Sequence, residues 1–276
     1  MPYLRQLIAR ARGADGQPPF SDQALVDLRT GARSLIDVPF GAAIVSRPAA
    51  GPSEAEFVVD PDARGRGIGT TLLERVVADT TGELLVWAHG DHPAARALAA
   101  SHGLVAVREL LQLRMPVPAA APVVEPAPVV EPAETRFAPF VVGADEDAWI
   151  ALNARVFAFH PEQGSVSGAD VVELESEPWF DAGDFIVARD GDRMVGYCWL
   201  KVEHGLGEIY VIGVDTSHRG EGLGRKLMTA GFARLAARGI HSVALYVESD
   251  NDPAVSLYRS LGFRKHSVDI QYRLSR

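Results

Sequence analysis

The second half of the chain alternates between segments with a helical period of apolar residues and segments with a strand period. Residues 145–159, DEDAWIALNARVFAF, place apolar side chains at helical spacing. Residues 185–202, FIVARDGDRMVGYCWLKV, contain two apolar runs around an Asp-Gly turn, which predicts two paired strands. The further predicted elements are a strand over 207–214, a helix over 224–239, a strand over 242–249, a helix over 252–262 and a strand over 267–274. This pattern predicts an α+β fold in which a central, mostly antiparallel sheet carries helices on both faces.

The first half repeats part of the second. Residues 58–69, VVDPDARGRGIG, align with residues 213–224, GVDTSHRGEGLG. Residues 92–104, HPAARALAASHGL, align with residues 251–263, NDPAVSLYRSLGF, at a slightly larger offset, as one small loop insertion would produce. A single repeat of this length predicts two copies of one domain rather than a solenoid.

A proline-rich segment separates the two copies. Residues 116–134 repeat Pro-Val-Val-Glu-Pro-Ala, and proline at this density favours an extended spacer over helix or sheet. We therefore expect one domain over residues 1–115, a linker over 116–134 and a second domain over 135–276. A chain of 276 residues is long enough for two such domains.

Composition narrows the class of protein. The formal net charge is −9, which argues against nucleic acid or an anionic membrane as a general partner. The only cysteine, Cys198, lies in an apolar strand-like run, so we expect a buried, inert thiol and a reducing compartment. No secretory signal is recognisable at the N-terminus, and no apolar run is long enough to span a bilayer. The sequence thus predicts a cytoplasmic protein, which we expect to be a monomer.

The glycine-rich turn at Arg219-Gly220-Glu221-Gly222-Leu223-Gly224 lies between a predicted strand and a predicted helix. We expect Gly222 and Gly224 to adopt dihedral angles closed to other residues, so that the backbone approaches a ligand closely. The free N–H groups of the helix's first turn then form an anion site suited to a pyrophosphate. A plain helix N-terminus explains such a turn equally well. The G-x-G-x-G spacing also differs from the G-x-G-x-x-G of dinucleotide-binding folds.

A second motif makes the turn more specific. Residues 251–263 contain Asn251, Ala254, Leu257, Tyr258, Gly262 and Phe263 in the pattern N-x-x-A-x-x-L-Y-x-x-x-G-F. With R-x-x-G-x-G after a strand, this resembles the GCN5-related N-acetyltransferases (GNAT). The resemblance implies two tandem GNAT domains that bind acetyl-CoA, with the pyrophosphate on the turn and the pantetheine arm along the backbone of residues 211–214. No metal is implied, because His160, Glu162 and His204 do not share a ligand spacing.

The resemblance implies a set of acetyl-CoA contacts in each half. In the second half they are Ile212, Gly213, Val214, Arg219, Gly220, Glu221, Gly222, Leu223, Gly224, Arg225, Asn251, Asp252, Pro253, Ala254, Val255 and Ser256. In the first half they are Phe57, Val58, Val59, Arg64, Gly65, Arg66, Gly67, Ile68 and Gly69.

Acetyl transfer to an amine needs a neutral amine, a stabilised oxyanion and a proton for the departing thiolate. The resemblance implies that Glu208 accepts the ammonium proton through water and that Tyr258 is the general acid. A backbone N–H such as that of Ile212 would stabilise the oxyanion. Without the resemblance, Glu208 reads as an exposed carboxylate at a strand edge, and Tyr258 reads as a core residue with a solvated hydroxyl.

The first half lacks part of this chemistry. In the alignment Tyr258 falls on Ala99, Asn251 falls on His92 and Glu208 falls on Ser53, next to Glu54. An alanine cannot protonate a thiolate. We therefore expect the first copy to bind acetyl-CoA or only to keep the fold, while the second copy catalyses.

Four stretches, among them FAFHPEQGS and LYVESDN, resemble a tandem branch of the family whose acceptor is the cysteinyl amine of cysteinyl-glucosaminyl-inositol. The acceptor ligands implied are Asp22, Glu162, Lys201, Glu208 and Tyr246. Asp22 could equally belong to a helix N-cap with Ser21. Two alternatives stay open: a tandem acetyltransferase for another small amine, such as an aminoglycoside or a peptide N-terminus, and a regulatory module that senses acetyl-CoA.

Overall fold

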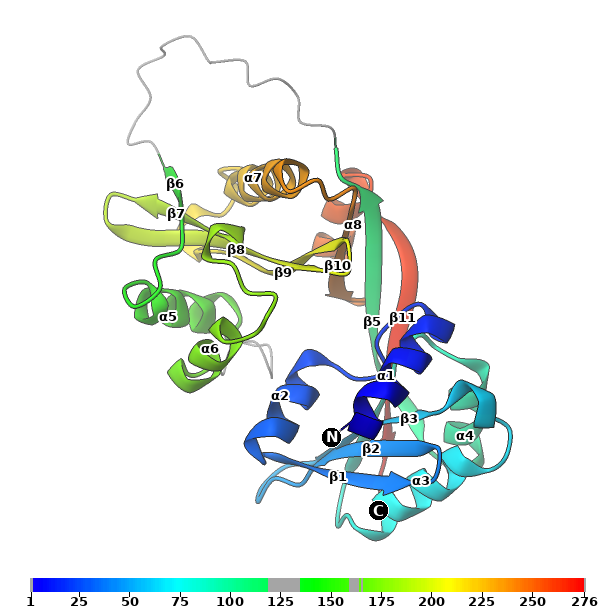
Figure 1. Cartoon of the computed structure of the whole chain (residues 1–276). Coiled ribbons are helices and arrows are strands. Elements are labelled where there is room, and N and C mark those ends of the chain that lie inside the picture. Colours follow the sequence, from blue (N-terminus) through cyan, green and yellow to red (C-terminus); the bar gives the residue numbers. More distant parts are fainter. Residues whose placement is uncertain (1, 119–134, 159–163, 165, 276) are drawn as a thin grey trace. The chain divides into compact units, whose positions relative to one another are not determined.

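The computed structural model describes residues 2–118, 135–158, 164 and 166–275 (Figure 1). The chain forms two compact units. The first contains Met1–Gln112, Val247–Leu261 and Lys265–Arg276, and the second contains Leu113–Tyr246 and Gly262–Arg264. The C-terminal end of the chain thus contributes to the first unit. Residues 119–134 of the predicted linker lie outside the described part, and the boundaries at 115 and 135 stay a prediction.

The first unit is a mixed sheet with helices. Its elements are α1 (Pro2–Asp15), α2 (Asp22–Thr30), β1 (Arg33–Val38), β2 (Gly41–Ser46), β3 (Ser53–Val59), the 3-10 helix η1 (Pro61–Ala63), α3 (Ile68–Ala78), β4 (Leu84–Ala88), α4 (Pro93–Ser101), α8 (Asp252–Ser260) and β11 (Arg264–Leu274), and β5 (Val105–Pro116) contributes residues to both units. The strand order is β1-β2-β3-β4-β11. Neighbouring strands are antiparallel except β3 and β4, which are parallel.

Alternation along β2 explains why both faces of this sheet are covered. Ala43 and Val45 point to one face, where they pack with α3 and α4. Ala42 and Ile44 point to the other face, where they pack with α1 and α2. A strand buried on both faces reads as a continuous apolar run, and all four side chains are at most 1% exposed.

The second unit repeats this architecture. Its elements are β6 (Arg136–Pro139), α5 (Glu146–Val156), α6 (Gly168–Glu175), the 3-10 helix η3 (Ala182–Asp184), β7 (Phe185–Asp190), β8 (Arg193–Glu203), β9 (Leu206–Val214), the 3-10 helix η4 (Thr216–His218), α7 (Leu223–Ala237) and β10 (Ser242–Glu248). The strand order is β10-β9-β8-β7-β6, with β9 and β10 parallel and the other pairs antiparallel. The predicted α+β class with a mostly antiparallel sheet is confirmed, although α6 was not among the predicted helices.

Helices cover both faces of this second sheet. On one face α5 and α6 pack on an aromatic cluster in which Phe185 stacks on Trp199 with ring centroids 4.4 Å apart. On the other face lies α7 (Figure 1), where Gly231 allows the helix to approach Cys198 closely. Cys198 is fully buried, and burial raises the pKa of its thiol to about 12. The predicted inert thiol agrees with this environment.

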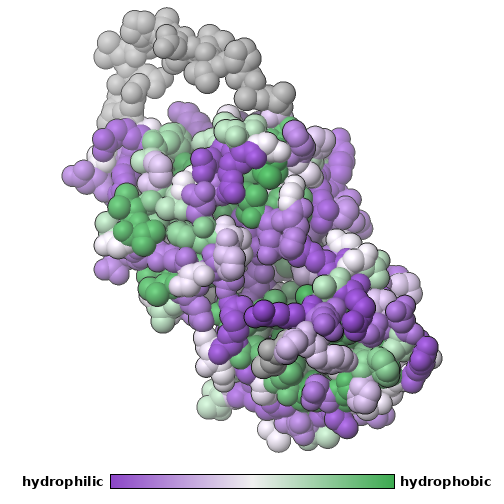
Figure 2. Space-filling model, viewed as in Figure 1, coloured by the Kyte–Doolittle hydropathy of each residue, from purple (hydrophilic) through white to green (hydrophobic). Residues whose placement is uncertain are grey.

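On the face seen in Figure 2, hydrophilic residues predominate and hydrophobic ones form small patches among them. In the part of the chain that the structure describes, no helix combines the length and the apolarity that a membrane crossing requires.

Candidate active site

Both units build the glycine-rich turn with the same backbone. Gly65 and Gly67 precede α3 with φ of 74° and 79°, and Gly220 and Gly222 precede α7 with φ of 86° and 73°. These angles are open to glycine and strained for other residues. The prediction that Gly222 needs such freedom is confirmed. The same prediction for Gly224 is wrong, because Gly224 already belongs to α7. Gly67 and Gly222 are the N-cap residues, and neither helix start has a capping side chain.

The arginine before each turn has a different environment in the two units. Arg64 donates from both terminal nitrogens to the two carboxylate oxygens of Asp15, each at 2.7 Å. These hydrogen bonds raise the pKa of Arg64, although its partial burial opposes the rise. His92 lies 3.6 Å from the same carboxylate. Arg219 is exposed, and among the described residues no hydrogen bond or ion pair of its side chain is found. In the first unit, the arginine of the glycine-rich turn (the first cradle) is therefore already paired with a carboxylate of the protein; the turn with Arg219 is the second cradle.

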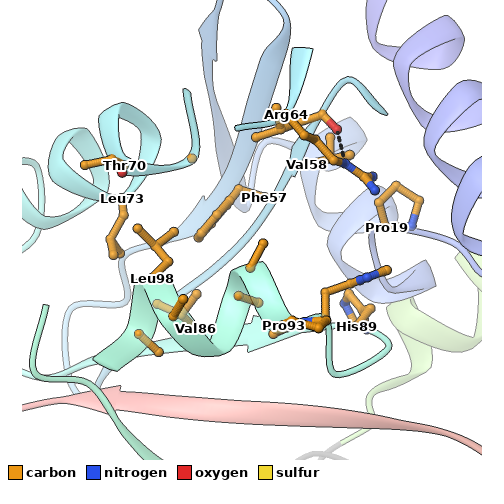
Figure 3. A pocket seen from close by; sticks show the side chains of 18 of the residues that line it. Pro19, Phe57, Val58, Arg64, Thr70, Leu73, Val86, His89, Pro93 and Leu98 are labelled. Carbon is orange, nitrogen blue, oxygen red and sulfur yellow. Dashed lines mark hydrogen bonds between the residues drawn. The ribbon is translucent and has the colours of Figure 1, made fainter. Parts of the chain in front are cut away.

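A cavity of about 840 Å³ opens beside the first turn. Figure 3 shows Leu73 and Leu98 at one end and His89, Pro93 and Pro19 at the other, with Phe57 between them. Its wall includes every acetyl-CoA contact predicted for the first half except Arg66, namely Phe57, Val58, Val59, Arg64, Gly65, Gly67, Ile68 and Gly69. Arg66 instead donates to the backbone oxygen of Asp62 at 3.0 Å. A largely apolar cavity with convergent polar groups is the usual form of a small-molecule site.

The two parallel strands of each unit pair only over part of their length. Pairing of β3 with β4 ends at Glu56↔Trp87, and pairing of β9 with β10 ends at Ile209↔Leu245. Beyond these points β3 continues to Val59 and β9 to Val214. The backbone groups of residues 57–59 and 210–214 that point away from β2 and β8 can therefore bind an extended ligand in the manner of an added strand. This is where the pantetheine arm was predicted.

β9 of the second unit has a β-bulge, and β3, its counterpart in the first unit, has none. Trp199 pairs with Val211 and Leu200 pairs with Ile209, so Tyr210 is an extra residue in β9. The pairing of β2 with β3 runs without a shift from Gly41↔Val59 to Ser46↔Glu54. Bulges re-aim side chains and occur often next to active sites.

The bulge corrects one alignment. Lys201 pairs with Glu208 in the second unit, and at the same step from the turn Ser46 pairs with Glu54 in the first. The counterpart of Glu208 is therefore Glu54 and not Ser53, because the extra residue Tyr210 shifts the register by one. The first unit keeps a carboxylate at this position.

That carboxylate is occupied by neighbours from its own unit. Arg33 Nη2 lies 3.0 Å from Glu54 Oε2, and Gln271 Nε2 donates to Glu54 Oε1 at 3.1 Å. Ala99, the counterpart of Tyr258, is buried in the core between α4 and the sheet. The first copy of the sequence repeat thus has an alanine in place of the phenol, and its carboxylate is bound by neighbouring side chains.

A buried network of charged side chains lies next to Glu54 along β3. His89 is 3.1 Å from Glu56 through Nε2 and 2.9 Å from Asp269 through Nδ1, and Ser21 donates to Glu56 from its N–H and its hydroxyl. Burial alone would lower the pKa of His89, but the hydrogen bonds and charges of the two carboxylates outweigh it and raise the pKa to about 10. Burial raises the pKa of Glu56, yet the bond and charge of His89 lower it below its usual value. His89 is an imidazolium with both nitrogens engaged.

In the second unit the predicted acceptor residues meet on one face of the sheet. Glu208 pairs with Lys201 on β8 and with Ala244 on β10, and Tyr246 follows two residues further along β10. Lys201 is 7% exposed, with its Nζ 5.3 Å from the ring centroid of Trp179 and 3.7 Å from a carboxylate oxygen of Glu203. The structure therefore brings Lys201, Glu208 and Tyr246 together.

Arg114, near the end of β5, also belongs to this cluster. Burial lowers the pKa of its guanidinium, while the neighbouring Tyr246 and Glu208 raise it. The sequence analysis missed Arg114, because it lies outside both motifs and next to the proline-rich segment. Only the pairing of β5 with β10 reveals it.

The other predicted residues lie as follows. Asp22 is the first residue of α2, whose N-cap is Ser21, accepting from Ala24 N–H at 3.2 Å. Asn251 caps α8, which carries Tyr258, and accepts from Ala254 N–H at 3.3 Å. Glu162 and His160 lie outside the described residues. Within the described ranges, no group of three or more His, Cys, Asp or Glu side chains could hold a metal ion.

Comparison with known proteins agrees with this architecture. The family model described as "Acetyltransferase (GNAT) family" matches residues 37–104 and 153–263. A GCN5-related N-acetyltransferase from Sphaerobacter thermophilus superposes with a TM-score of 0.69 at 23% identity, covering 99% of this chain and 91% of that one. A tandem GNAT protein from the clavulanic acid biosynthesis pathway gives a TM-score of 0.69 at 18% identity, covering 98% and 93%. These structures confirm the fold of two tandem GNAT domains.

Relatives of higher identity narrow the family. A mycothiol acetyltransferase of Clavibacter michiganensis subsp. michiganensis is 48% identical over 98% of this chain and 90% of its own length. A mycothiol acetyltransferase of Kocuria rhizophila is 43% identical over 99% of this chain and 96% of its own. From its two matched domains and its full-length similarity to these enzymes, the chain belongs to the mycothiol acetyltransferases of the GNAT family.

Proposed function

We propose that this enzyme transfers the acetyl group of acetyl-CoA to the cysteinyl amine of cysteinyl-glucosaminyl-inositol, giving mycothiol and CoA. The observation that carries the proposal is the cluster of Lys201, Glu208 and Tyr246 on three neighbouring strands, in a chain similar to mycothiol acetyltransferases over nearly its whole length. Such a polar acceptor with one ammonium calls for carboxylates and hydrogen-bonding side chains around it.

The reaction forms a C–N bond and breaks the C–S bond of the thioester. Glu208 takes a proton from the ammonium through water, so that the amine attacks in its neutral form. The N–H of Ile212, on the part of β9 that is not paired with β10, stabilises the oxyanion. Tyr258 then protonates the CoA thiolate, and its phenolate takes up the second proton that the amine nitrogen loses as the amide forms. Arg219 and the N–H groups at the start of α7 hold the pyrophosphate.

The other acceptor ligands in this proposal are Lys201 and Tyr246, with Glu162 and Asp22. Lys201 is held against the Trp179 ring rather than extended into solvent, at the strand position that pairs with Glu208. Such a lysine suits the hydroxyl groups of a sugar or inositol ring. The small-molecule acceptor, the cytoplasmic location and the monomeric state predicted from the sequence belong to this proposal.

The first unit binds acetyl-CoA in this proposal but does not turn it over. Its cavity of about 840 Å³, its positive-φ glycines and its uncapped helix start support binding. Its alanine at position 99 and its bound Glu54 argue against chemistry. A purely regulatory protein would not need Glu208 and Tyr258 in the second half.

The test is acetyl transfer by the full chain to a panel of amines, read by mass spectrometry. We expect a product from cysteinyl-glucosaminyl-inositol and little from an aminoglycoside or a peptide N-terminus. If only one of the other amines were acetylated, that amine would be the acceptor instead. If no amine were acetylated, the result would favour a regulatory module.

The role of Tyr258 is tested in the same assay. Tyr258→Phe keeps the ring and removes the proton, so turnover is expected to fall by about 10²-fold or more while the Kd for acetyl-CoA stays within about twofold. Unchanged turnover would show that Tyr258 is not the general acid.

A further inference from the structure

We propose that Arg114 is a positioning residue of the acceptor site, whose guanidinium holds the Glu208 carboxylate ionised and oriented toward the acceptor amine. This inference rests on the proposed function, because it assigns Arg114 a role through Glu208. Neither sequence motif contains Arg114.

The strand pairing places Arg114 in line with Glu208. Val117 N–H donates to the backbone oxygen of His241 at 3.0 Å and Ser249 N–H donates to that of Glu109 at 2.8 Å, so β5 runs antiparallel to β10. Counting three residues back along β5 and three forward along β10 sets Arg114 opposite Ala244. Ala244 pairs with Glu208, and Glu208 pairs with Lys201.

Residues directly opposite one another on neighbouring strands share a face of the sheet. Arg114, Ala244, Glu208 and Lys201 therefore form one row across β5, β10, β9 and β8. Ala244 is fully buried and carries only a methyl group, which leaves room above it for the long Arg114 side chain to reach Glu208. The electrostatic coupling of Arg114 to Glu208 and Tyr246 agrees with this placement.

The first unit has an equivalent row of residues, with leucine in the place of Ala244. There Arg273 lies opposite Leu85, and Leu85 pairs with Glu54. In this row Arg273 is 3.6 Å from Glu83 at the surface, and Glu54 is bound by Arg33 and Gln271. Arg273 thus has another carboxylate as its partner, although it stands at the position equivalent to Arg114.

Two cations then flank Glu208. Arg114 approaches from the side of β10 and Lys201 from β8, while Glu203 takes part of the charge of Lys201 and the phenol of Tyr246 adds a polar neighbour. Tyr210 is the nearest titratable side chain on β9 itself. A positive charge within a few ångströms favours the ionised form of a carboxylate. Glu208 is thereby kept ready to accept a proton at neutral pH.

The test measures kcat/KM of the full-length enzyme against pH, with saturating acetyl-CoA and cysteinyl-glucosaminyl-inositol. Arg114→Met removes the charge but keeps the length, so the acid limb of the profile is expected to move up by about one pH unit. Activity on the acid side then falls about tenfold beyond any loss at the plateau. Arg114→Lys restores most of the limb position, and KM for acetyl-CoA is unchanged.

Arg273→Met is the matched control, because it removes the arginine at the equivalent place in the first unit, and its profile should match that of the unaltered enzyme. An acid limb of Arg114→Met that coincides with that of the unaltered enzyme overturns the proposal, whatever the loss at the plateau. Arg114→Gln serves the same purpose if the methionine variant does not fold. Absence of transfer by the unaltered enzyme would refute the proposed function itself, which is a separate outcome.

Discussion

The ion pair between Arg64 and Asp15 leads to a prediction about the first cradle. Asp15→Asn keeps the shape of the side chain and removes the charge that now binds both terminal nitrogens of Arg64. A ligand phosphate has to compete with this carboxylate for the same guanidinium. We therefore expect the variant to bind CoA more tightly in the first unit.

The magnitude follows from the exposure of the pair. The side chains of Arg64 and Asp15 are 37% and 12% exposed, so the pair is partly screened and its loss is worth about 1 kcal/mol. Repulsion between the carboxylate and a phosphate on the other side of the guanidinium, at a distance of about 6 Å in a mostly aqueous setting, adds about 1 kcal/mol. A total of about 1–2 kcal/mol corresponds to a Kd lower by roughly five- to thirtyfold.

The assay is titration calorimetry with CoA on a chain whose second cradle is blocked by Gly222→Val, since a β-branched residue is strained at a φ of 73°. Asp62→Asn is the matched control, because Asp62 lies beside the same turn and its loss changes the net charge equally. A Kd unchanged by Asp15→Asn would refute the competition. Equal tightening in both variants would mean that only net charge matters.

Three further predictions concern Glu208, His89 and β11. Glu208→Gln is expected to lower the rate of acetyl transfer most at low pH, where the amine is mostly protonated; a loss that is the same at every pH would point to a binding role. For His89, a folded pKa near 10 against about 6.5 unfolded means that its stabilising contribution is complete below about pH 6.5 and is lost as the pH rises through 10. His89→Gln should therefore lower the free energy of unfolding in urea by about 3–5 kcal/mol at pH 6, where it removes the cation that lies between two buried carboxylates, and by much less at pH 10.5; an equal loss at both would contradict the ion network. Ending the chain at Arg264 removes the strand that pairs with β4 from Ile270↔Ala88 to Leu274↔Leu84, so thermal unfolding of the first unit should move to lower temperature, and an unchanged transition would show that β11 is dispensable.

The sequence predicts the second unit well, because its patterns are local. A continuous apolar run predicts β8 and alternation agrees with β9, and the two glycine-rich turns contain the residue type that a positive φ favours. The short helix α6 was missed, although Ser167 and Asp170 form a capping box that marks its start. Eight residues with little periodicity give too weak a pattern to be assigned without that cap.

What the sequence could not supply is pairing between distant segments. Alternation tells which face a side chain occupies but not which strand lies next to it, so nothing in residues 264–274 indicates that they pair with β4. The extra residue Tyr210 is equally invisible, because a bulge changes register without changing composition. The misassigned counterpart of Glu208, the unforeseen Arg114 and the competing Asp15 all follow from contacts of this kind.

The asymmetry between the two units can be traced to internal compensation of charge. Both units keep an arginine before the turn and a carboxylate on the strand that leads into it. In the first unit Asp15 binds the arginine, while Arg33 and Gln271 bind the carboxylate. A buried polar group that is fully satisfied stabilises the fold but has little left to offer a substrate. In the second unit Arg219 is exposed, and Glu208 stands in a row whose central residue is alanine. Both copies thus keep these groups, and in the first copy the protein's own Asp15, Arg33 and Gln271 bind them.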